Sequence, residues 1–337
     1  MSRRTVAIHK DMHPMCNSYP HARKSPLLLM FFMIVALAGA ACRSPDVSTT
    51  KAITPPEGVK DINGAQLYYK AIGKGQPLVF LHGSGGSHRY FLPHLQTLAG
   101  EYQLLFYDQR GTGLSNGRPD LANTIDQFVE DLEALRLTFG FEKISLIGHS
   151  WGAIIALFYA LKHQDHLDKL ILVDPVPVAP MFLIEQNQTI KQRVARLSPE
   201  MQQMLTTCQG SSAELRSEVR TECLKIDAAL RFYDPAKALT IDTTIDKNTA
   251  RNAATINSLI ATSFTRKRRD LDANLKTIRV PTLLIHGDFD PIPIGASEYI
   301  HQRIPASQLV IMQQSGHFPF VEQPEMFLAA IRTFMRA

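Results

Sequence analysis

Cysteine is scarce in this chain, with four in 337 residues, at positions 16, 42, 208 and 223. So few cysteines exclude the dense disulfide framework of small secreted scaffolds. No second pair of cysteines or histidines lies at the spacing of a structural zinc site. We therefore expect no metal site.

Charge is also low, with 20% charged residues and a formal net charge of +5. Most of the positive excess lies in the first 41 residues, which hold Arg3, Arg4, Lys10, Arg23 and Lys24 against Asp11. The basic run RKRR at 266–269 is interpreted as a solvated helix face, with a contact to anionic lipid or substrate as the alternative. No basic stripe alternates with aromatic residues, so we expect no nucleic-acid partner.

Long apolar runs are absent except for PLLLMFFMIVALAGAA at residues 26–41. This run follows Arg23 and Lys24 and ends in small residues, which is typical of a secretory signal. It is short for a membrane span, which needs about 20 apolar residues. We predict that residues 1–41 are a signal peptide and that the body is exported to a bacterial cell envelope, periplasmic or membrane-anchored, with full secretion as the less favoured alternative.

Cys42 directly follows Gly39, Ala40 and Ala41, an order that resembles the cleavage and lipidation site of bacterial lipoproteins. That family usually has leucine three residues before the cysteine, where this chain has Gly39. The resemblance implies a lipidated Cys42 and a membrane tether; ordinary cleavage after an Ala-x-Ala site and a retained anchor are the alternatives. Residues 42–58 are rich in Ser, Thr and Pro and are predicted to form the linker.

Cys208 and Cys223 remain after the leader is removed, and export makes a disulfide between them plausible. The alternative is two separate thiols in a helical segment. The sequence leaves both alternatives open, and it does not indicate the oligomeric state.

The fold class follows from short apolar runs that alternate with helical stretches. The runs lie at 77–83, 102–108, 143–150, 169–175, 280–290 and 307–317, after a hairpin with an Asn63-Gly64 turn. This alternation predicts an α/β fold with a mostly parallel central sheet and helices on both faces. The polar, Gln-rich stretch 176–277 is predicted to be a helical cap inserted into a core of residues 59–175 and 278–337.

The strongest chemical signal is GHSWG at 148–152, which follows the apolar run ISLI and precedes a helical run. A serine on a tight strand-to-helix turn is held with its hydroxyl exposed, and the flanking glycines let the turn close. We predict Ser150 as a nucleophile.

A serine nucleophile needs a base within hydrogen-bond reach and an acid that orients the base. His317 and Asp290 follow Ser150 after two later predicted strands, in the order nucleophile, acid, histidine that this motif requires. Asp288 competes with Asp290 for the acid role. The sequence after this strand resembles the pattern G-x-x-D of chains with the serine motif, which from Gly287 selects Asp290, so we favour Asp290.

An oxyanion hole needs backbone N–H groups aimed at the developing negative charge. The predicted donors are Trp151, directly after the nucleophile, and Ser84 in the loop HGSGG at 82–86. The alternative for that loop is a simple glycine-rich turn; no P-loop lysine follows, so phosphate binding is not favoured. This chemistry implies an acyl-enzyme formed on a small-molecule or short-peptide substrate, and no cofactor.

These motifs and their order resemble the α/β-hydrolase superfamily over residues 60–337. DQRGTGLS at 108–115 and the following stretch to Gly152 resemble the proline iminopeptidase family, whose members remove an N-terminal residue, often proline, from short peptides. The resemblance implies that Arg110 braces the active-site loops, with a substrate contact as the alternative.

Two departures from that family bear on the substrate. The family usually has HGGPG where this chain has HGSGG, and a glycine where this chain has His149; G-H-S-x-G is common among esterases. Exopeptidases of this kind hold the substrate ammonium with cap carboxylates, for which this chain offers Glu185, Glu200, Glu214, Glu218 and Glu222. We therefore keep two hypotheses, an aminopeptidase and a carboxylesterase-like hydrolase, with an acyltransferase or a ligand-binding module as further alternatives.

Overall fold

The computed structural model describes residues 53, 55–117, 124–209, 217–242 and 247–337. The predicted signal peptide, Cys42 and most of the linker lie outside the described residues and stay predictions. Among the described helices, none is both long and apolar enough to cross a bilayer.

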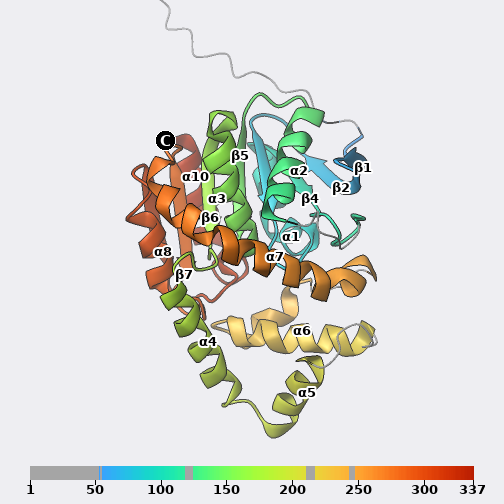
Figure 1. The fold of residues 1–337 in the computed structure, drawn as a ribbon, viewed down its shortest axis with the longest axis vertical. Coiled ribbons are helices and arrows are strands. Elements are labelled where there is room, and N and C mark those ends of the chain that lie inside the picture. The colour runs from blue at the N-terminus through green and yellow to red at the C-terminus, as the bar shows by residue number, and fades with distance from the viewer. Residues whose placement is uncertain (1–52, 54, 118–123, 210–216, 243–246) are drawn as a thin grey trace, which may run out of the picture. The chain divides into compact units, whose positions relative to one another are not determined.

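One eight-stranded sheet forms the centre of the body (Figure 1), and its strands lie in the order β1-β2-β4-β3-β5-β6-β7-β8. β2 runs antiparallel to β1 and β4, and the other neighbours are parallel. The predicted mostly parallel sheet is confirmed. The strands are β1 (Glu57–Ile62), β2 (Ala65–Ile72), β3 (Pro77–Leu81), β4 (Gln103–Tyr107), β5 (Ile144–His149), β6 (Leu167–Val173), β7 (Thr282–Gly287) and β8 (Ser307–Met312).

The local sequence explains these strands. Every residue of β3, β4 and β5 is buried, as expected for apolar strands covered on both faces. The β1–β2 hairpin turns at Asn63 and Gly64, whose φ values of 47° and 75° fit the two-residue turn that favours Asn-Gly.

Helices cover both faces of the sheet. Leu146 and Leu172 belong to a core shared with α2 (Ile125–Thr138), α3 (Trp151–His163) and α8 (Ile294–His301). Ile147 and Ile171 belong to a second core, shared with α1 (Leu92–Leu95), α9 (Pro319–Glu322) and α10 (Pro324–Arg336). Short 3-10 helices are η1 (His88–Tyr90), η2 (Gln96–Gly100), η3 (Gln164–His166), η4 (Pro235–Thr240) and η5 (Leu275–Thr277).

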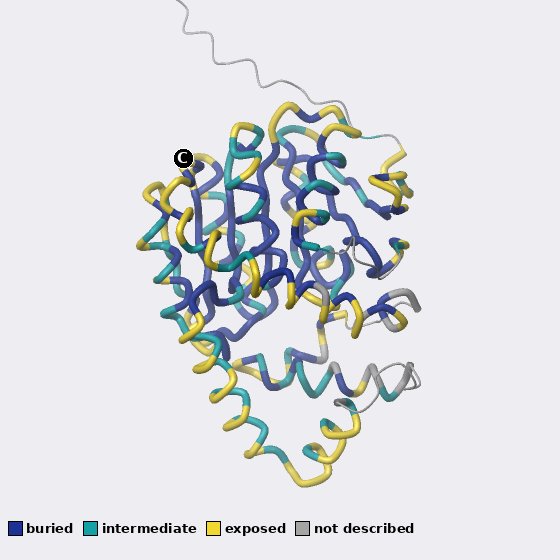
Figure 2. Tube along the Cα trace, in the orientation of Figure 1, coloured by how far each residue is buried: buried dark blue, intermediate teal, exposed yellow. Residues whose placement is uncertain are grey.

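The described chain between β6 and β7 is mainly helical, with α4 (Pro180–Val194), α5 (Pro199–Gln209), α6 (Ser217–Arg231) and α7 (Lys247–Asn274). α4, α5 and α6 lie below the sheet in Figure 1, and most of α4 and α5 is exposed in Figure 2. α7 differs, since its Ile256, Ile260 and Phe264 join the core on the α3 side. The helices of this region therefore divide into an outer group and one helix packed on the body.

Cys208 and Cys223 form a disulfide that joins α5 to α6, with their Cα atoms 5.7 Å apart. Of the two alternatives that the sequence left open, the structure shows the paired one.

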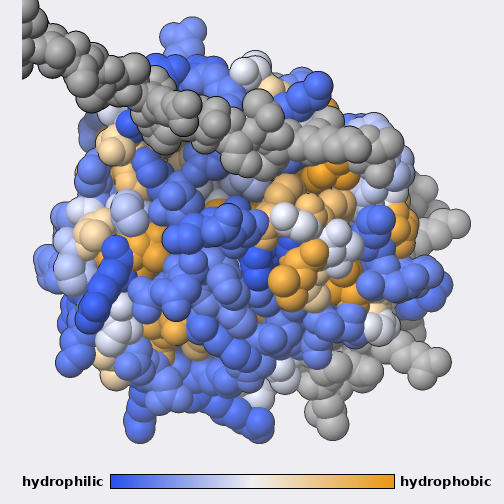
Figure 3. All heavy atoms as spheres, turned by 90° about the horizontal axis from the view of Figure 1, so that it is seen from above, coloured by the Kyte–Doolittle hydropathy of each residue, from blue (hydrophilic) through white to orange (hydrophobic). Residues whose placement is uncertain are grey.

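At the opposite end of the body, the visible face is largely hydrophilic, with apolar residues in separate smaller patches (Figure 3).

Candidate active site

Ser150 lies on the sharp turn between β5 and α3. Its φ of 55° and ψ of −116° are strained for a residue with a side chain. The turn is also crowded, because a Cβ on Gly152 would lie 2.1 Å from the Leu81 carbonyl oxygen, and one on Gly148 would lie 2.6 Å from that of Gly152. Only glycine fits at these two positions, which explains the spacing of the motif.

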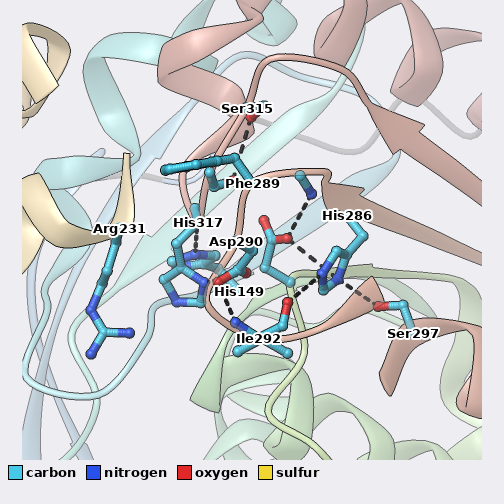
Figure 4. A network of polar contacts seen from close by, with 12 residues as sticks. His149, Arg231, His286, Phe289, Asp290, Ile292, Ser297, Ser315 and His317 are labelled. Carbon is cyan, nitrogen blue, oxygen red and sulfur yellow. Dashed lines mark hydrogen bonds and ion pairs between the residues drawn. The ribbon is translucent and has the colours of Figure 1, made fainter. Parts of the chain in front are cut away.

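His317 and Asp290 lie on the loops that follow β8 and β7, and their side chains meet (Figure 4). His317 Nδ1 lies 2.7 Å from Asp290 Oδ2, and the Ile292 N–H donates to Asp290 Oδ1 at 2.9 Å. Burial raises the pKa of Asp290, but the charge and hydrogen bond of His317 outweigh it and lower that pKa to about 2. Asp290 is therefore an anion that fixes the orientation of the His317 ring.

Asp288, the competing carboxylate, has a different place. It is exposed, and its Oδ1 accepts a hydrogen bond from the Ser315 N–H at 3.1 Å. This bond links the turn after β7 to the loop that carries His317.

Ser150, His317 and Ser84 line one cavity of about 200 Å³. The Ser84 hydroxyl donates to Asn257 Oδ1 at 2.7 Å, so this loop is joined to α7. Trp151 is the first residue of α3, where a backbone N–H has no partner within the helix. The structure thus brings the predicted nucleophile, base and one predicted oxyanion donor to the same cavity and places the second donor beside them.

A chain of hydrogen bonds, not foreseen from the sequence, joins the two sides of the site through His149. The His149 Nε2–H donates to the His317 carbonyl at 2.7 Å, so Nδ1 accepts from the Tyr90 hydroxyl at 3.1 Å. The Tyr90 oxygen in turn accepts from the Gly83 N–H. Burial lowers the pKa of His149 well below its usual value, which keeps the ring neutral in this chain of bonds.

The cap contributes charged groups to the cavity. Asp227, Arg231 and Asp242 line it, and Asp227 accepts from Arg231 Nε at 2.8 Å. The sequence had suggested glutamates instead. Of these, Glu185, Glu200 and Glu222 are exposed and do not line this cavity, and the side chains of Glu214 and Glu218 lie outside the described residues.

Glu322 ties the His317 loop to the cap. Its Oε2 accepts from the Gly316 N–H at 2.5 Å, and its Oε1 accepts from the Asp234 N–H at 2.9 Å. The His317 N–H donates to the Arg231 carbonyl at 2.8 Å. The end of α6 and the loop that carries His317 therefore hold each other in place.

Arg110 is buried and does not line the cavity. Its Nε and Nη2 donate to Asp131 of α2 at 2.9 and 2.8 Å, and Nη2 also reaches the Asn63 carbonyl. These bonds tie the loop after β4 to α2 and to the β1–β2 turn, and the role of Arg110 in bracing the active-site loops stays a prediction.

Among the described residues, three groups of His, Asp and Glu side chains lie close enough to hold an ion, one around Glu133 and two around Asp174. Glu133 is paired with Arg136 at 2.6 Å, and in the second and third groups His317 and Asp290 are hydrogen-bonded to each other. In each group at least one of the side chains is therefore engaged in an ion pair or hydrogen bond within the protein, and we assign no metal to these groups.

Comparison with known proteins places this chain in a family. The sequence model of the family described as "alpha/beta hydrolase fold" matches residues 76–324. A proline iminopeptidase from Saccharolobus solfataricus is 32% identical over 299 residues, covering 84% of this chain and 93% of the relative. A proline iminopeptidase from Heyndrickxia coagulans is 28% identical, covering 83% and 99%.

Solved structures agree on the fold. A thermophilic esterase from Thermogutta terrifontis superimposes with a TM-score of 0.61 at 26% identity, covering 83% of this chain and 98% of that one. An alpha/beta fold family hydrolase from Bacillus anthracis gives a TM-score of 0.64 at 20% identity, covering 82% and 98%.

Proposed function

The chain is a hydrolase that belongs to the α/β-hydrolase fold family, and from this premise we propose that it cleaves an ester or amide bond through Ser150, His317 and Asp290. The observation that carries the proposal is the meeting of a strained serine turn and an Asp290-oriented histidine at one cavity. This is the arrangement that activates a serine hydroxyl.

The proposed mechanism follows from these positions. Ser150 Oγ attacks the acyl carbon, and His317 Nε2 takes its proton because Nδ1 is bonded to Asp290. The N–H groups of Ser84 and Trp151 stabilise the oxyanion, each contributing about a hundredfold to a thousandfold in rate. His317 then protonates the leaving group, and water releases the acyl group from Ser150.

The substrate class that we favour is a short peptide or aminoacyl amide with a free N-terminus, as in the proline iminopeptidases that this chain resembles. Asp227, which accepts a hydrogen bond from Arg231, and Asp242 bring two carboxylates to the cavity. Carboxylates on a cavity wall attract a substrate ammonium.

A second candidate is a carboxylesterase-like activity. His149 replaces the glycine usual in iminopeptidases, and the thermophilic esterase shares the fold at 26% identity. Apolar side chains on the cavity wall, Ala228, Ile241 and Phe318, suit an uncharged acyl group.

The experiment that separates the two compares kcat/KM of the full-length protein on prolyl and alanyl arylamides with short-chain aryl esters, with Ser150→Ala as the control. Amide turnover that Ser150→Ala abolishes and Asp227→Asn weakens through KM supports the aminopeptidase. Turnover of esters alone contradicts it and supports the esterase. Turnover that persists in Ser150→Ala contradicts the serine mechanism itself.

We also propose export and lipidation at Cys42. The disulfide between Cys208 and Cys223 supports an oxidising compartment, because such bonds are rare in the cytosol. Intact-mass analysis of the protein from membranes tests this: a lipid on Cys42 that Cys42→Ser removes is expected, and an unmodified N-terminus after cleavage contradicts lipidation.

A further inference from the structure

Asp174 is a buried carboxyl group to which the mechanism above gives no role. It directly follows β6, has a φ of 44°, and is fully buried. The Gly287 N–H donates to its Oδ1 at 2.9 Å, whereas Oδ2 has no donor among the described residues. Burying a carboxylate oxygen without a hydrogen-bond donor costs free energy, so this environment disfavours the ionised form of Asp174.

His286, the histidine nearest to Asp174, is neutral and does not supply a positive charge to the Asp174 carboxyl group. His286 Nε2 lies 2.9 Å from the Ile292 carbonyl, which can only accept, so Nε2 carries the proton (Figure 4). Nδ1 then has a lone pair, which accepts from the Ser297 hydroxyl at 2.8 Å, and the same Nδ1 lies 3.5 Å from Asp174 Oδ1. Burial lowers the pKa of His286, so the ring stays neutral.

Asp174 also lies beside Asp290. Ligand atoms of Asp174, His286 and Asp290 are within 4.8 Å of one another, and so are those of Asp174, His149 and His317. Two carboxylates this close in a buried site do not both ionise readily. Burial, Asp290 and the more distant Glu322 raise the pKa of Asp174 well above its usual value, whereas Asp290 has two donors and stays charged.

We propose that Asp174 and Asp290 share one negative charge and one proton, with Asp174 as the neutral member that positions Asp290. The Asp174 hydroxyl donates to the Asp290 carboxylate, which is the acceptor that an unpartnered Oδ2 requires. Asp174 is a positioning residue, since it acts on His317 through Asp290. The inference rests on the proposed function, because it concerns the acid of that triad.

Sharing one charge has a measurable consequence. When Asp290 is removed, the like charge that kept Asp174 protonated is gone, and Asp174 ionises within 4.8 Å of a His317 ring nitrogen. It then stabilises the histidine cation in place of Asp290. Loss of Asp290 alone should therefore cost less than the about ten-thousandfold drop seen when a triad acid is replaced elsewhere.

The test is a double-mutant cycle on the full-length protein, read as kcat/KM against pH on p-nitrophenyl acetate or prolyl arylamide, whichever is turned over. Asp174→Asn alone should lower kcat/KM less than about tenfold without moving the acid limb, since the amide also donates. Asp290→Ala should cost about a hundredfold, and Asp174→Asn in the Asp290→Ala background should cost at least about thirtyfold more. Asp61→Asn, which neutralises an exposed carboxyl group on the edge strand β1, is the control and should add no such loss in that background.

Two results would overturn the shared charge. One is that Asp174→Asn causes no added loss of kcat/KM in the Asp290→Ala background. The other is that Asp174→Asn alone moves the acid limb of the pH profile to lower pH. Circular dichroism checks the fold, and Asp174→Ser, a smaller neutral donor, repeats the cycle if the asparagine variant does not fold. Activity that survives in Ser150→Ala would overturn the proposed triad together with this inference, whereas a flat cycle with inactive Ser150→Ala would overturn this inference alone.

Discussion

At the scale of single residues, a chain of hydrogen bonds through His149 connects the loops of the site. Gly83, Tyr90, His149 and the His317 carbonyl form a chain in which each group donates to the next. Because His149 is buried and neutral, it can join the nucleophile turn to the His317 loop without adding a charge beside the base. This gives a physical reason for a histidine directly before the serine.

The depressed pKa of Asp290 predicts a pH dependence of stability. The folded-state pKa is about 2, below the unfolded value near 3.8, so the group stabilises the fold above the unfolded value. That contribution is lost as the pH falls from about 4 to about 2. Urea unfolding of the wild type and of the double variant Asp174→Asn/Asp290→Asn measures it, because Asp174 ionises when Asp290 alone is removed. The wild type should lose more stability over this interval than the double variant, and equal losses would contradict the Asp290 ion.

At the scale of elements, Glu322 holds the His317 loop against the segment that follows α6, through hydrogen bonds to both. Glu322→Gln replaces one acceptor oxygen by an N–H donor, which then faces the N–H of Gly316 or Asp234. We expect a loss of about 1 to 3 kcal/mol in unfolding free energy and a kcat lower by about tenfold, with KM changed less.

The matched control for this prediction is Glu325→Gln, an exposed glutamate on the neighbouring helix α10. It should change neither quantity appreciably. A Glu322→Gln variant with wild-type kcat and stability would show that the loop is held by other contacts.

The disulfide between α5 and α6 predicts a second effect at this scale. It closes a loop of 15 residues, for which constraint of the unfolded chain contributes about 3 kcal/mol. Neither cysteine lines the cavity. Cys208→Ser/Cys223→Ser should therefore lower the melting temperature while kcat on a small ester stays within about twofold. A variant that melts like the wild type would contradict a stabilising disulfide.

At the scale of the whole molecule, the sheet was predictable because each buried strand is a short apolar run between turn signals. The predicted runs agree with β3 to β8 to within a few residues. Ser150, Asp290 and His317 could be proposed from sequence because each lies on the turn or loop that follows a strand, and the carboxyl ends of parallel strands meet at one edge of the sheet.

The rest could not be read from the sequence, because it depends on which face of an element meets the cavity. Glutamates on solvated cap helices look the same in sequence as carboxylates that line a pocket, and the structure brings Asp227 and Asp242 to the cavity instead. In the sequence, Asp174 is simply the polar residue near the end of a predicted apolar strand, and nothing there points to Asp290. Its closeness to Asp290 follows only from the pairing of β6 with β7.

The most direct test of the central claim is covalent labelling of the full-length protein with a fluorophosphonate, located by peptide mapping. The account predicts one label, on Ser150, that is absent in Ser150→Ala and forms at least about a thousandfold more slowly in His317→Ala, because the hydroxyl then lacks its base. Labelling at another residue, or equal rates in the wild type and His317→Ala, would contradict it.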